Sequence, residues 1–517
     1  MPTMRCPQCG TEFEKGSVEF CPNPNCGYPV SFLEEPQEDQ PTPRMERKPG
    51  EAIPAPPPVP APAPPPPPPP PQRPPRKLKV PVIALVAVVV VIAAVAAFLL
   101  LGHNKKSTPK PHATKSPHPK TSKTTQPPVA GELSWQTLVQ PSFTGAGTGD
   151  QEIHALTGAQ KIHGGAGIKF VAAGFDASAG DEDAAVWESQ DGAQWIEVHD
   201  DALGGSGDQV INGITLSGGK ILAGGSDGSD AALWSSADGQ SWSEVSSPES
   251  SALGGVGDQV INRLRGTPAG ILAVGYDSSS GAKDAAVWIS KDGGHSWTRA
   301  TDPTHALGGS GDQEIARVEV VTTGLGGVVA VGSDSSHGGD AAVWFSNDGQ
   351  TWQRVPDPNG VLGGPGKQEM NDVQTFGTTL MAVGSDTKGG DADGAVWTSP
   401  NGVDWQRVPD PKNVFGGAGD QVFTRLVTPA QFDSTEIPNI MVGGFDTSGG
   451  DADAAIWFSN DGKAWARETR QKDIFGGSGD QKITSIAANA FPVIAVGFDA
   501  SRGDEDAAAW VASGPAT

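Results

Sequence analysis

Four cysteines near the start of the sequence could bind a metal ion. They form two pairs, Cys6 with Cys9 and Cys21 with Cys26, and eleven residues separate the pairs. Four thiolates at this spacing can close tetrahedrally on one Zn²⁺, and the glycine after each pair permits the tight turn that such a site needs. Two disulfides are the alternative, which the reducing environment of the cytosol disfavours. We therefore expect all four cysteines to be zinc ligands.

The segment that carries these cysteines, residues 1–30, resembles a zinc-ribbon. A segment this short has too little apolar core to fold without its metal. The resemblance implies a small structural or partner-docking module, and a cytosolic protein is the partner that we expect for it.

Aspartates recur in pairs beyond residue 131 and could bind a second metal. Three hairpins have the spacing Asp-x-Ser-x-Gly-Asp-x-Asp, whose clustered oxygens suit Ca²⁺. These candidate calcium ligands are Asp176, Asp181, Asp183, Asp446, Asp451, Asp453, Asp499, Asp504 and Asp506. The alternative is that each aspartate caps its own turn and accepts hydrogen bonds from a neighbouring loop. We favour this alternative, because the pair persists where the hairpin shortens to residues 227–230.

Three arginines, Arg263, Arg317 and Arg425, occupy one position of a repeated segment and could bind an anion. Guanidinium groups gathered around one point suit a carboxylate ligand. Asp372 holds the same position in another copy of the segment, so a neutralising ring of salt bridges is the simpler reading. Tyr276, the one tyrosine in residues 131–517, occupies a place that other copies fill with Phe, and we interpret it as a packing residue.

The element that must position these residues is a repeat. A Gly-x-Gly-Asp-Gln phrase or a close variant recurs seven times, at intervals of 50 to 60 residues. Its fourth residue stands at Asp150, Asp208, Asp258, Asp312, Lys367, Asp420 and Asp480. A regular interval of this length indicates one supersecondary unit packed on copies of itself.

Each copy divides into four short strands, for example at residues 259–265, 270–275 and 284–290 and from residue 296. The strands are mostly apolar and are bounded by Gly, Asp and Ser, as in sheets covered on both faces by their neighbours. Four short strands in about 55 residues match one blade of a β-propeller. We therefore expect an all-β fold, a β-propeller over residues 131–517.

Tryptophans give the number of blades and the way the ring closes. One Trp of the third strand recurs seven times, at Trp187, Trp234, Trp288, Trp344, Trp397, Trp457 and Trp510. The Trp that opens the fourth strand recurs only six times, and the missing copy stands at Trp135, ahead of the first repeat. Seven four-stranded blades follow, closed by an N-terminal strand that completes the C-terminal blade and leaves no open edge.

The turn between the third and fourth strands resembles the Asp-box of sialidase-like propellers. Residues 290–297, which read Ser-Lys-Asp-Gly-Gly-His-Ser-Trp, fit the full form, and five other blades carry near matches. The resemblance implies that the box is a folding element on the face opposite the family's active site. A sialidase-like glycoside hydrolase is thus the alternative function, although the family's Tyr/Glu nucleophile pair has no match in this sequence.

Residues 80–101 form an uncharged apolar stretch that, as a helix of about 33 Å, would span a bilayer. An acidic and then Pro-rich linker precedes this transmembrane helix at residues 31–79, and a Lys/Ser/Thr/Pro stalk follows it at residues 102–130. Basic residues flank both ends, so charge does not orient the helix. The cysteines orient it instead: we expect the N-terminus in the cytosol and the propeller outside the cell membrane.

Charge narrows the choice of partner. Residues 1–130 carry 15 basic and 9 acidic side chains, whereas residues 131–517 carry 21 and 51. This excess of negative charge disfavours nucleic acid as a partner of the propeller. Since no nucleophile–base pair or phosphate-binding loop is present, we expect a binding or scaffold module for an extracellular protein, a glycan or a wall polymer.

Overall fold

The computed structural model describes residues 3–5, 12–14, 133–139, 143–144, 148–158, 170–245, 252–322, 326–429, 437–469, 471–488 and 492–515. The chain divides into two compact units, Met1–Thr124 and Thr125–Thr517. In the first unit, β1 (Thr3–Arg5) pairs antiparallel with β2 (Glu12–Glu14). The four cysteines, the span at 80–101, the linker and the stalk lie outside the described residues. Among the residues that are described, no helix has the length and apolarity to cross a membrane.

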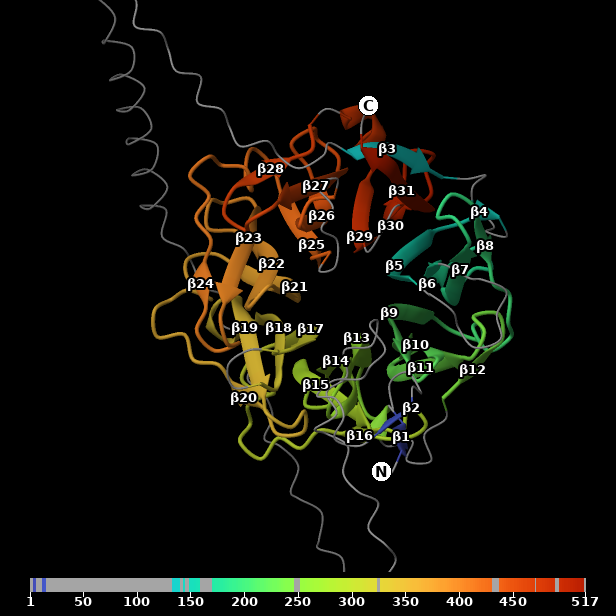
Figure 1. The fold of residues 1–517 in the computed structure, drawn as a ribbon, viewed down its shortest axis with the longest axis vertical. Helices are drawn as coiled ribbons and strands as arrows, with labels where there is room; N and C mark the ends of the chain where they lie inside the picture. The colour runs from blue at the N-terminus through green and yellow to red at the C-terminus, as the bar shows by residue number, and fades with distance from the viewer. Residues whose placement is uncertain are drawn as a thin grey trace, which may run out of the picture. The chain divides into compact units, whose positions relative to one another are not determined.

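The second unit folds into seven sheets arranged around a common axis (Figure 1). Blade one contains β5 (Gln151–Gly158), β6 (Phe170–Asp176), β7 (Asp183–Ser189) and β8 (Trp195–Glu197). Blade two contains β9 (Gln209–Ser217), β10 (Lys220–Asp227), β11 (Asp230–Ser236) and β12 (Trp242–Glu244). Blade three contains β13 (Gln259–Thr267), β14 (Gly270–Asp277), β15 (Asp284–Ser290) and β16 (Thr298–Arg299). The fourth and fifth contain β17 (Gln313–Val320), β18 (Val328–Asp334), the 3-10 helix η3 (Ser335–His337), β19 (Asp340–Ser346) and β20 (Gln353–Arg354); and β21 (Gln368–Phe376), β22 (Thr379–Asp386), β23 (Asp393–Ser399) and β24 (Gln406–Arg407). The last two contain β25 (Gln421–Val427), β26 (Ile440–Asp446), β27 (Asp453–Ser459) and β28 (Trp465–Arg467); and, after α2 (Lys472–Phe475), β29 (Gln481–Ala487), β30 (Val493–Asp499), β31 (Asp506–Pro515) and β3 (Leu133–Leu138).

The seventh blade joins the two ends of the propeller. Its outer strand β3 pairs antiparallel with β31, so that Thr137 lies opposite Trp510 and Trp135 lies opposite Ala512. Figure 1 shows β3 beside β31 near the C-terminus. The predicted seven four-stranded blades and their closure by the N-terminal strand are therefore confirmed.

The first blade has a fifth strand that the sequence did not predict. This strand, β4 (Phe143–Thr144), runs parallel to β8 at the outer edge of the blade. The Phe143 ring stacks on Trp195 with a centroid distance of 5.9 Å and an interplanar angle of 6°. Two residues are too few to show a periodicity, so only this contact reveals the strand.

The apolar core is divided among the seven interfaces between neighbouring blades. Described buried side chains form seven clusters, and each cluster draws residues from two adjacent sheets. Between blades two and three, for example, Leu233 and Leu264 pack with Trp288 and Trp297. Strands that are covered on both faces in this way explain why the sequence is apolar without a simple alternation.

The Asp-box turns behave as the resemblance implied. The Asp292 carboxylate accepts hydrogen bonds from the backbone N–H groups of His295 and Ser296, at 3.0 and 2.9 Å. Ser290 Oγ accepts from the Gly294 N–H at 2.8 Å. These bonds hold the turn that leads the third strand into the fourth.

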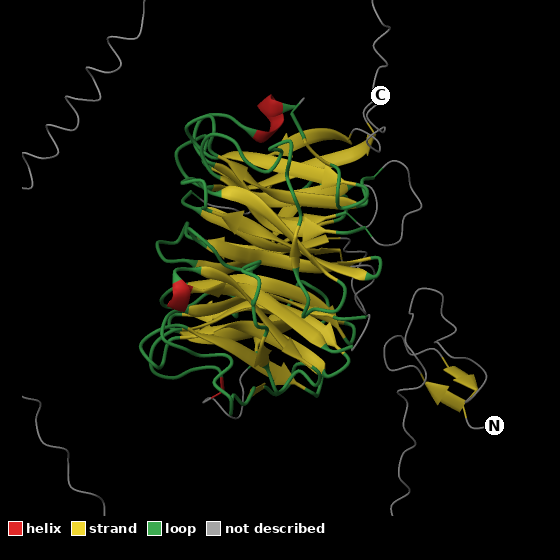
Figure 2. Ribbon diagram, turned by 90° about the vertical axis from the view of Figure 1, so that its left-hand side faces the viewer, coloured by secondary structure: helices red, strands yellow, loops and turns green. Residues whose placement is uncertain are grey.

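The loops gather at the two faces between which the strands run (Figure 2). One face carries the loops from the fourth strand to the next first strand together with the hairpins between second and third strands. These two sets of loops are hydrogen-bonded to each other, as in the bond from Gln209 N to Glu182 O. We call this face the Asp-rich rim. The Asp-box turns lie at the other ends of the strands.

Candidate functional site

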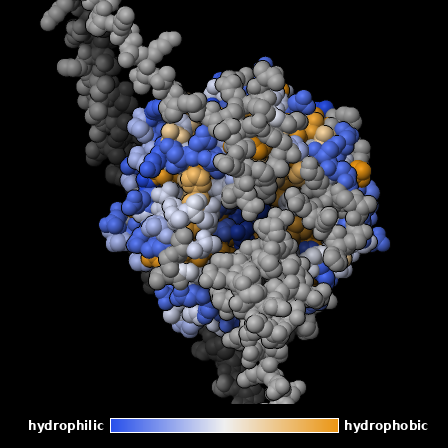
Figure 3. All heavy atoms as spheres, in the orientation of Figure 1, coloured by the Kyte–Doolittle hydropathy of each residue, from blue (hydrophilic) through white to orange (hydrophobic). Residues whose placement is uncertain are grey.

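The first strands of all seven blades line a cavity at the axis of the ring. Its volume is about 410 Å³, and β5, β9, β13, β17, β21, β25 and β29 all contribute to its wall. The lining begins near the middle of each strand, for example at Leu156 in β5 and Arg263 in β13, and continues toward the C-terminal end. The cavity thus occupies the half of the channel away from the Asp-rich rim. The space-filling view shows a hollow with hydrophilic atoms at the centre of the ring (Figure 3).

A β-bulge in each first strand places the charged residues of the cavity. In β13 the register shifts just before Arg263 and leaves Asn262 as the extra residue. The same shift precedes Arg317, Asp372 and Arg425 in their strands, and it recurs in the other three blades. A bulge re-aims the side chains that follow it. The four charged residues that share one position in the sequence therefore also share one position around the channel.

The extra residue of the bulge ties neighbouring blades together. Asn262 Nδ2 donates to the carbonyl of Ile315 at 3.0 Å, and Asn371 Nδ2 donates to that of Phe423 at 2.9 Å. Thr484 in the last blade donates to a carbonyl of β5 in the first. These bonds tie neighbouring first strands to one another around the cavity.

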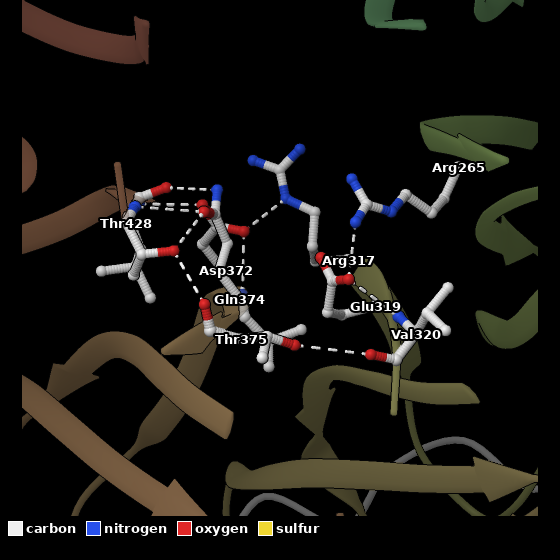
Figure 4. A network of polar contacts seen from close by, with 10 residues as sticks. Arg265, Arg317, Glu319, Val320, Asp372, Gln374, Thr375 and Thr428 are labelled. Carbon is white, nitrogen blue, oxygen red and sulfur yellow. Dashed lines mark hydrogen bonds and ion pairs between the residues drawn. The ribbon is translucent and has the colours of Figure 1, made fainter. Parts of the chain in front are cut away.

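Asp372 is the anionic centre of the cavity and is fully buried. Its Oδ1 lies 2.7 Å from Arg317 Nε, and its Oδ2 lies 3.3 Å from Arg425 NH1. The carboxylate also accepts from the backbone N–H groups of Val373 and Leu426, both at 2.8 Å. The predicted salt bridges between Asp372 and two of the arginines are therefore present. Figure 4 shows the contact of Arg317 with Asp372, with the terminal nitrogens of Arg317 directed away from the carboxylate.

A second ion pair, which the sequence did not predict, lies two residues further along the strands. Arg265 NH2 lies 2.6 Å from Glu319 Oε1, and the same oxygen accepts from the Val320 N–H at 2.9 Å. Glu319 is buried, whereas the Arg265 side chain is 46% exposed. Because both residues belong to neighbouring first strands, a comparison of β13 with β17 could have found the pair.

Arg263 is buried in the wall of the cavity and differs from the other arginines. Among the residues that the structure describes, it has no ion pair and no hydrogen bond. Burial lowers the pKa of Arg263 well below its usual value, and the positive charge of Arg317 adds to this effect. Arginine nonetheless keeps its proton in proteins. The described lining of the cavity thus contains four guanidinium groups and two carboxylates, and Arg263 is the one of these arginines outside an ion pair.

The Asp-rich rim holds the candidate calcium ligands, which lie in blades one, six and seven. Asp176, Asp446 and Asp499 end the second strands of these blades. Each Oδ1 accepts from a backbone N–H two residues later at 2.7–2.8 Å, and from the Gln side chain of the repeated phrase at 3.0–3.4 Å. These are the turn-capping bonds that we favoured over calcium.

The remaining candidates in blades one and six bond to the next blade. Asp183 and Asp453 accept from glycine N–H groups of the following loop at 3.2 and 3.4 Å. Asp181 and Asp451 accept from a second glycine at 3.0 and 2.9 Å. In blade seven, Asp504 and Asp506 hold the equivalent positions. Within the described residues, no three His, Cys, Asp or Glu side chains form a group that could hold a metal ion. Calcium binding stays a prediction.

Tyr276 lies away from the central cavity, in the second strand of blade three, where it pairs with Val260 and Ala285. The Lys283 Nζ atom lies 3.9 Å from the centre of its ring. This position agrees with the interpretation of Tyr276 as a packing residue.

The structure also reveals a set of arginines on the fourth strands that sequence reasoning missed. In blades three to six, an arginine two residues after the fourth-strand Trp pairs with the aspartate that ends the second strand. The pairs are Arg299–Asp277 at 2.9 Å, Arg354–Asp334 at 3.3 Å, Arg407–Asp386 at 3.1 Å and Arg467–Asp446. The pattern Trp-x-Arg recurs at these four places in the sequence and could have revealed the set.

The structure has distant likenesses among known proteins. No protein-family model matches the sequence, and a search of curated proteins finds no match. The structure resembles Sqt1 from Chaetomium thermophilum, with 12% identity and a TM-score of 0.37 over 71% of this chain and 82% of that one. It also resembles the Trypanosoma rangeli sialidase, with 12% identity and a TM-score of 0.34 over 69% of this chain and 54% of the sialidase. An endo-arabinase from Bacteroides thetaiotaomicron shares 9% identity and a TM-score of 0.26 over 51% of this chain and 92% of the enzyme.

Proposed function

We propose that the protein is a membrane-anchored binding module whose propeller holds an anionic group of its ligand in the central cavity. The anion is a carboxylate or phosphate of an extracellular protein, a glycan or a wall polymer. Residues 80–101 would form the anchor, with the propeller outside the membrane and the ribbon in the cytosol. The observation that carries the proposal is Arg263, a buried cation that forms no ion pair among the described residues.

The charges of the cavity support an anion as ligand. A guanidinium group taken out of water without a partner is costly, because the low-dielectric interior does not replace its hydration. An anion that entered beside Arg263 and the terminal nitrogens of Arg317 would remove this cost and gain charge-assisted hydrogen bonds. The hydrogen-bonded wall of first strands also limits the conformational entropy that binding would cost.

The same cavity is poorly equipped for glycoside hydrolysis. That reaction generally uses two carboxyl groups, one as a proton donor and the other as a nucleophile or base. Burial raises the pKa of Glu319, but this residue is bonded to Arg265, and Asp372 is bonded to Arg317 and Arg425. The residues that line the cavity include no tyrosine. Binding without hydrolysis therefore fits the arrangement better than the sialidase-like alternative.

Calorimetric titration of the full-length chain tests this proposal. The probes are an oligosaccharide of glucuronic acid, poly(glycerol phosphate) and a neutral glucan of matched length. We expect at least one anionic probe to bind, and Arg263→Met to weaken that binding about tenfold or more, since losing one charge-assisted contact costs about 1.5–3 kcal/mol. The control Lys291→Gln, at an exposed lysine of an Asp-box turn, should bind like the unaltered chain. Equal binding by the Arg263→Met variant, or hydrolysis of a fluorogenic sialoside, would contradict the proposal.

Metals enter the proposal at two places. We propose that Cys6, Cys9, Cys21 and Cys26 hold one Zn²⁺, which metal analysis of the purified chain and of a Cys6→Ser variant tests.

A calcium titration followed by thermal unfolding tests the Asp-rich rim. A melting temperature that rises with calcium would mean that the ion competes with the loop amides for these carboxylates.

A further inference from the structure

Blade two carries the exposed Glu244 in place of the fourth-strand arginine, and blade one also departs from the arginine pattern. At the position of Arg299, Arg354, Arg407 and Arg467 it carries Glu197, which pairs in register with Trp187 as Arg299 pairs with Trp288. Asp176 still ends the second strand, as the partner aspartates do in blades three to six. Two acidic side chains therefore occupy the positions where blades three to six place an acid and a base.

Within the described residues, these two acids have no arginine paired with them, unlike the aspartates of blades three to six. Asp176 is 6% exposed, and its Oδ1 is engaged by Ser178 and Gln151, but no cation pairs with it within the described residues. The Glu197 side chain is 10% exposed, and its Oε2 is buried without a hydrogen-bond partner. The nearest base, His199, lies 3.9 Å from the other oxygen and is itself 72% exposed. A buried carboxylate oxygen without a hydrogen-bond donor destabilises the folded protein, so binding of a donor there would be favourable.

Glu197 lines a surface pocket of about 730 Å³ on the Asp-rich rim. Its wall includes Asp183, His199, Asp200, Leu203 and Gly205, and we name it the blade-one acidic pocket. Blade five has a pocket of about 780 Å³ in the same place. The equivalent residues Asp393, Asp410, Phe415 and Gly416 line it. In blade five, Arg407 lies in that pocket, with its guanidinium carbon 4.4 Å from the ring centre of Trp397.

We propose that the blade-one acidic pocket binds the guanidinium group of an arginine side chain supplied by a partner protein. Blades three to six show what this position of the fold can hold, namely a guanidinium between an aspartate and the face of a tryptophan. A metal ion fits less well, because no group of three or more potential ligands occurs among the described residues. The pocket lies on the rim and is separate from the central cavity, so this inference does not depend on the proposed function.

The charges around Glu197 give the site a pH dependence. Burial raises the pKa of Glu197 to about 7, and the nearby negative charge of Asp176 contributes. The other charged groups of the pocket are Asp183 on β7 and His199, Asp200 and Asp201 in the loop after β8. Because a guanidinium prefers an ionised partner, binding should tighten as the pH rises from 6 to 8.

The test is calorimetric titration of the full-length chain with acetyl-Gly-Arg-Gly-amide, compared with the same peptide carrying neutral citrulline. We expect the arginine peptide to bind about tenfold more tightly or better, as for a desolvated charge pair. Glu197→Arg, which installs the residue of blades three to six, should abolish this preference, and Glu197→Gln should reduce it about tenfold. Glu244→Gln alters the exposed glutamate at the same position of blade two and should leave binding unchanged.

Three results would overturn the proposal: equal binding of the two peptides, an undiminished preference in both Glu197 variants, or displacement of the arginine peptide by Ca²⁺ at stoichiometric concentration. Thermal unfolding checks that each variant is folded, and Glu197→Gln suffices if Glu197→Arg is not. Arg263→Met should leave binding of the arginine peptide unchanged. That variant separates a failure of this inference from a failure of the anion-binding function.

Discussion

Arg317 Nε lies 2.7 Å from Oδ1 of Asp372, although the two residues belong to different blades and stand 55 positions apart in the sequence. Arg425 reaches the other oxygen of the same carboxylate from the opposite neighbour. One buried aspartate therefore links three consecutive blades at the wall of the channel. The contact therefore joins neighbouring blades and also offsets positive charge in the cavity.

Replacing this aspartate should destabilise the propeller. Asp372→Asn leaves two buried guanidinium groups without their anion, so we expect the free energy of unfolding to fall by about 3–5 kcal/mol. Urea unfolding followed by tryptophan fluorescence measures the change. The exposed Asp258→Asn is the control and should shift the free energy of unfolding by less than about 0.5 kcal/mol. Equal stability of the two variants would show that the buried network contributes nothing.

Replacing Arg263 should have the opposite effect on stability. Among the residues that the structure describes, this buried cation has no ion pair, so Arg263→Met removes a desolvation cost without breaking one. We expect the free energy of unfolding to rise by about 1–3 kcal/mol, the usual cost of an unsatisfied buried polar group. The same unfolding experiment at low phosphate measures it. A loss of stability would mean that Arg263 already has a stabilising partner.

The sequence predicted the parts of this molecule that repeat. Trp135 and Trp510 could be assigned to one sheet because counting the fourth-strand tryptophans left a single gap, and the shared position of Arg317 and Asp372 predicted their salt bridge. It did not predict the pair of Arg265 and Glu319, which depends on how far neighbouring first strands are offset. Nor did the sequence single out Glu197, since Glu244 holds the same position of blade two and only burial in the structure distinguishes the two glutamates.

Closure of the ring should depend on Trp135. This side chain is 4% exposed, and its ring contacts Phe475 at a centroid distance of 5.5 Å in an edge-on arrangement. Trp135→Ala should lower the free energy of unfolding by about 3–5 kcal/mol, because it leaves a large cavity beside the strand that joins the two ends. Ile196→Ala, at a side chain that is 63% exposed, is the control. A similar small effect in both variants would argue that β3 is dispensable.

The stability of the propeller should fall as the pH rises from about 5 to 8. A hydrogen bond with Glu152 raises the pKa of Glu505 to about 8, with burial as a further cause. The folded chain therefore keeps a proton on Glu505 that the unfolded chain has already released, so that unfolding becomes more favourable as the pH increases through this window. Above about pH 8 both states have lost the proton and the dependence on this group ends.

The variant Glu505→Gln isolates this effect, because glutamine can donate to Glu152 at every pH. We expect its melting temperature to fall less steeply with pH than that of the unaltered chain, with the largest gain near pH 8. Glu244→Gln, at an exposed glutamate, should keep the original slope. Thermal unfolding at pH 5, 6, 7 and 8 measures both variants. If the slope is as steep in Glu505→Gln as in the unaltered chain, the proton is held elsewhere, and Glu197, whose pKa burial raises to about 7, is the next residue to replace.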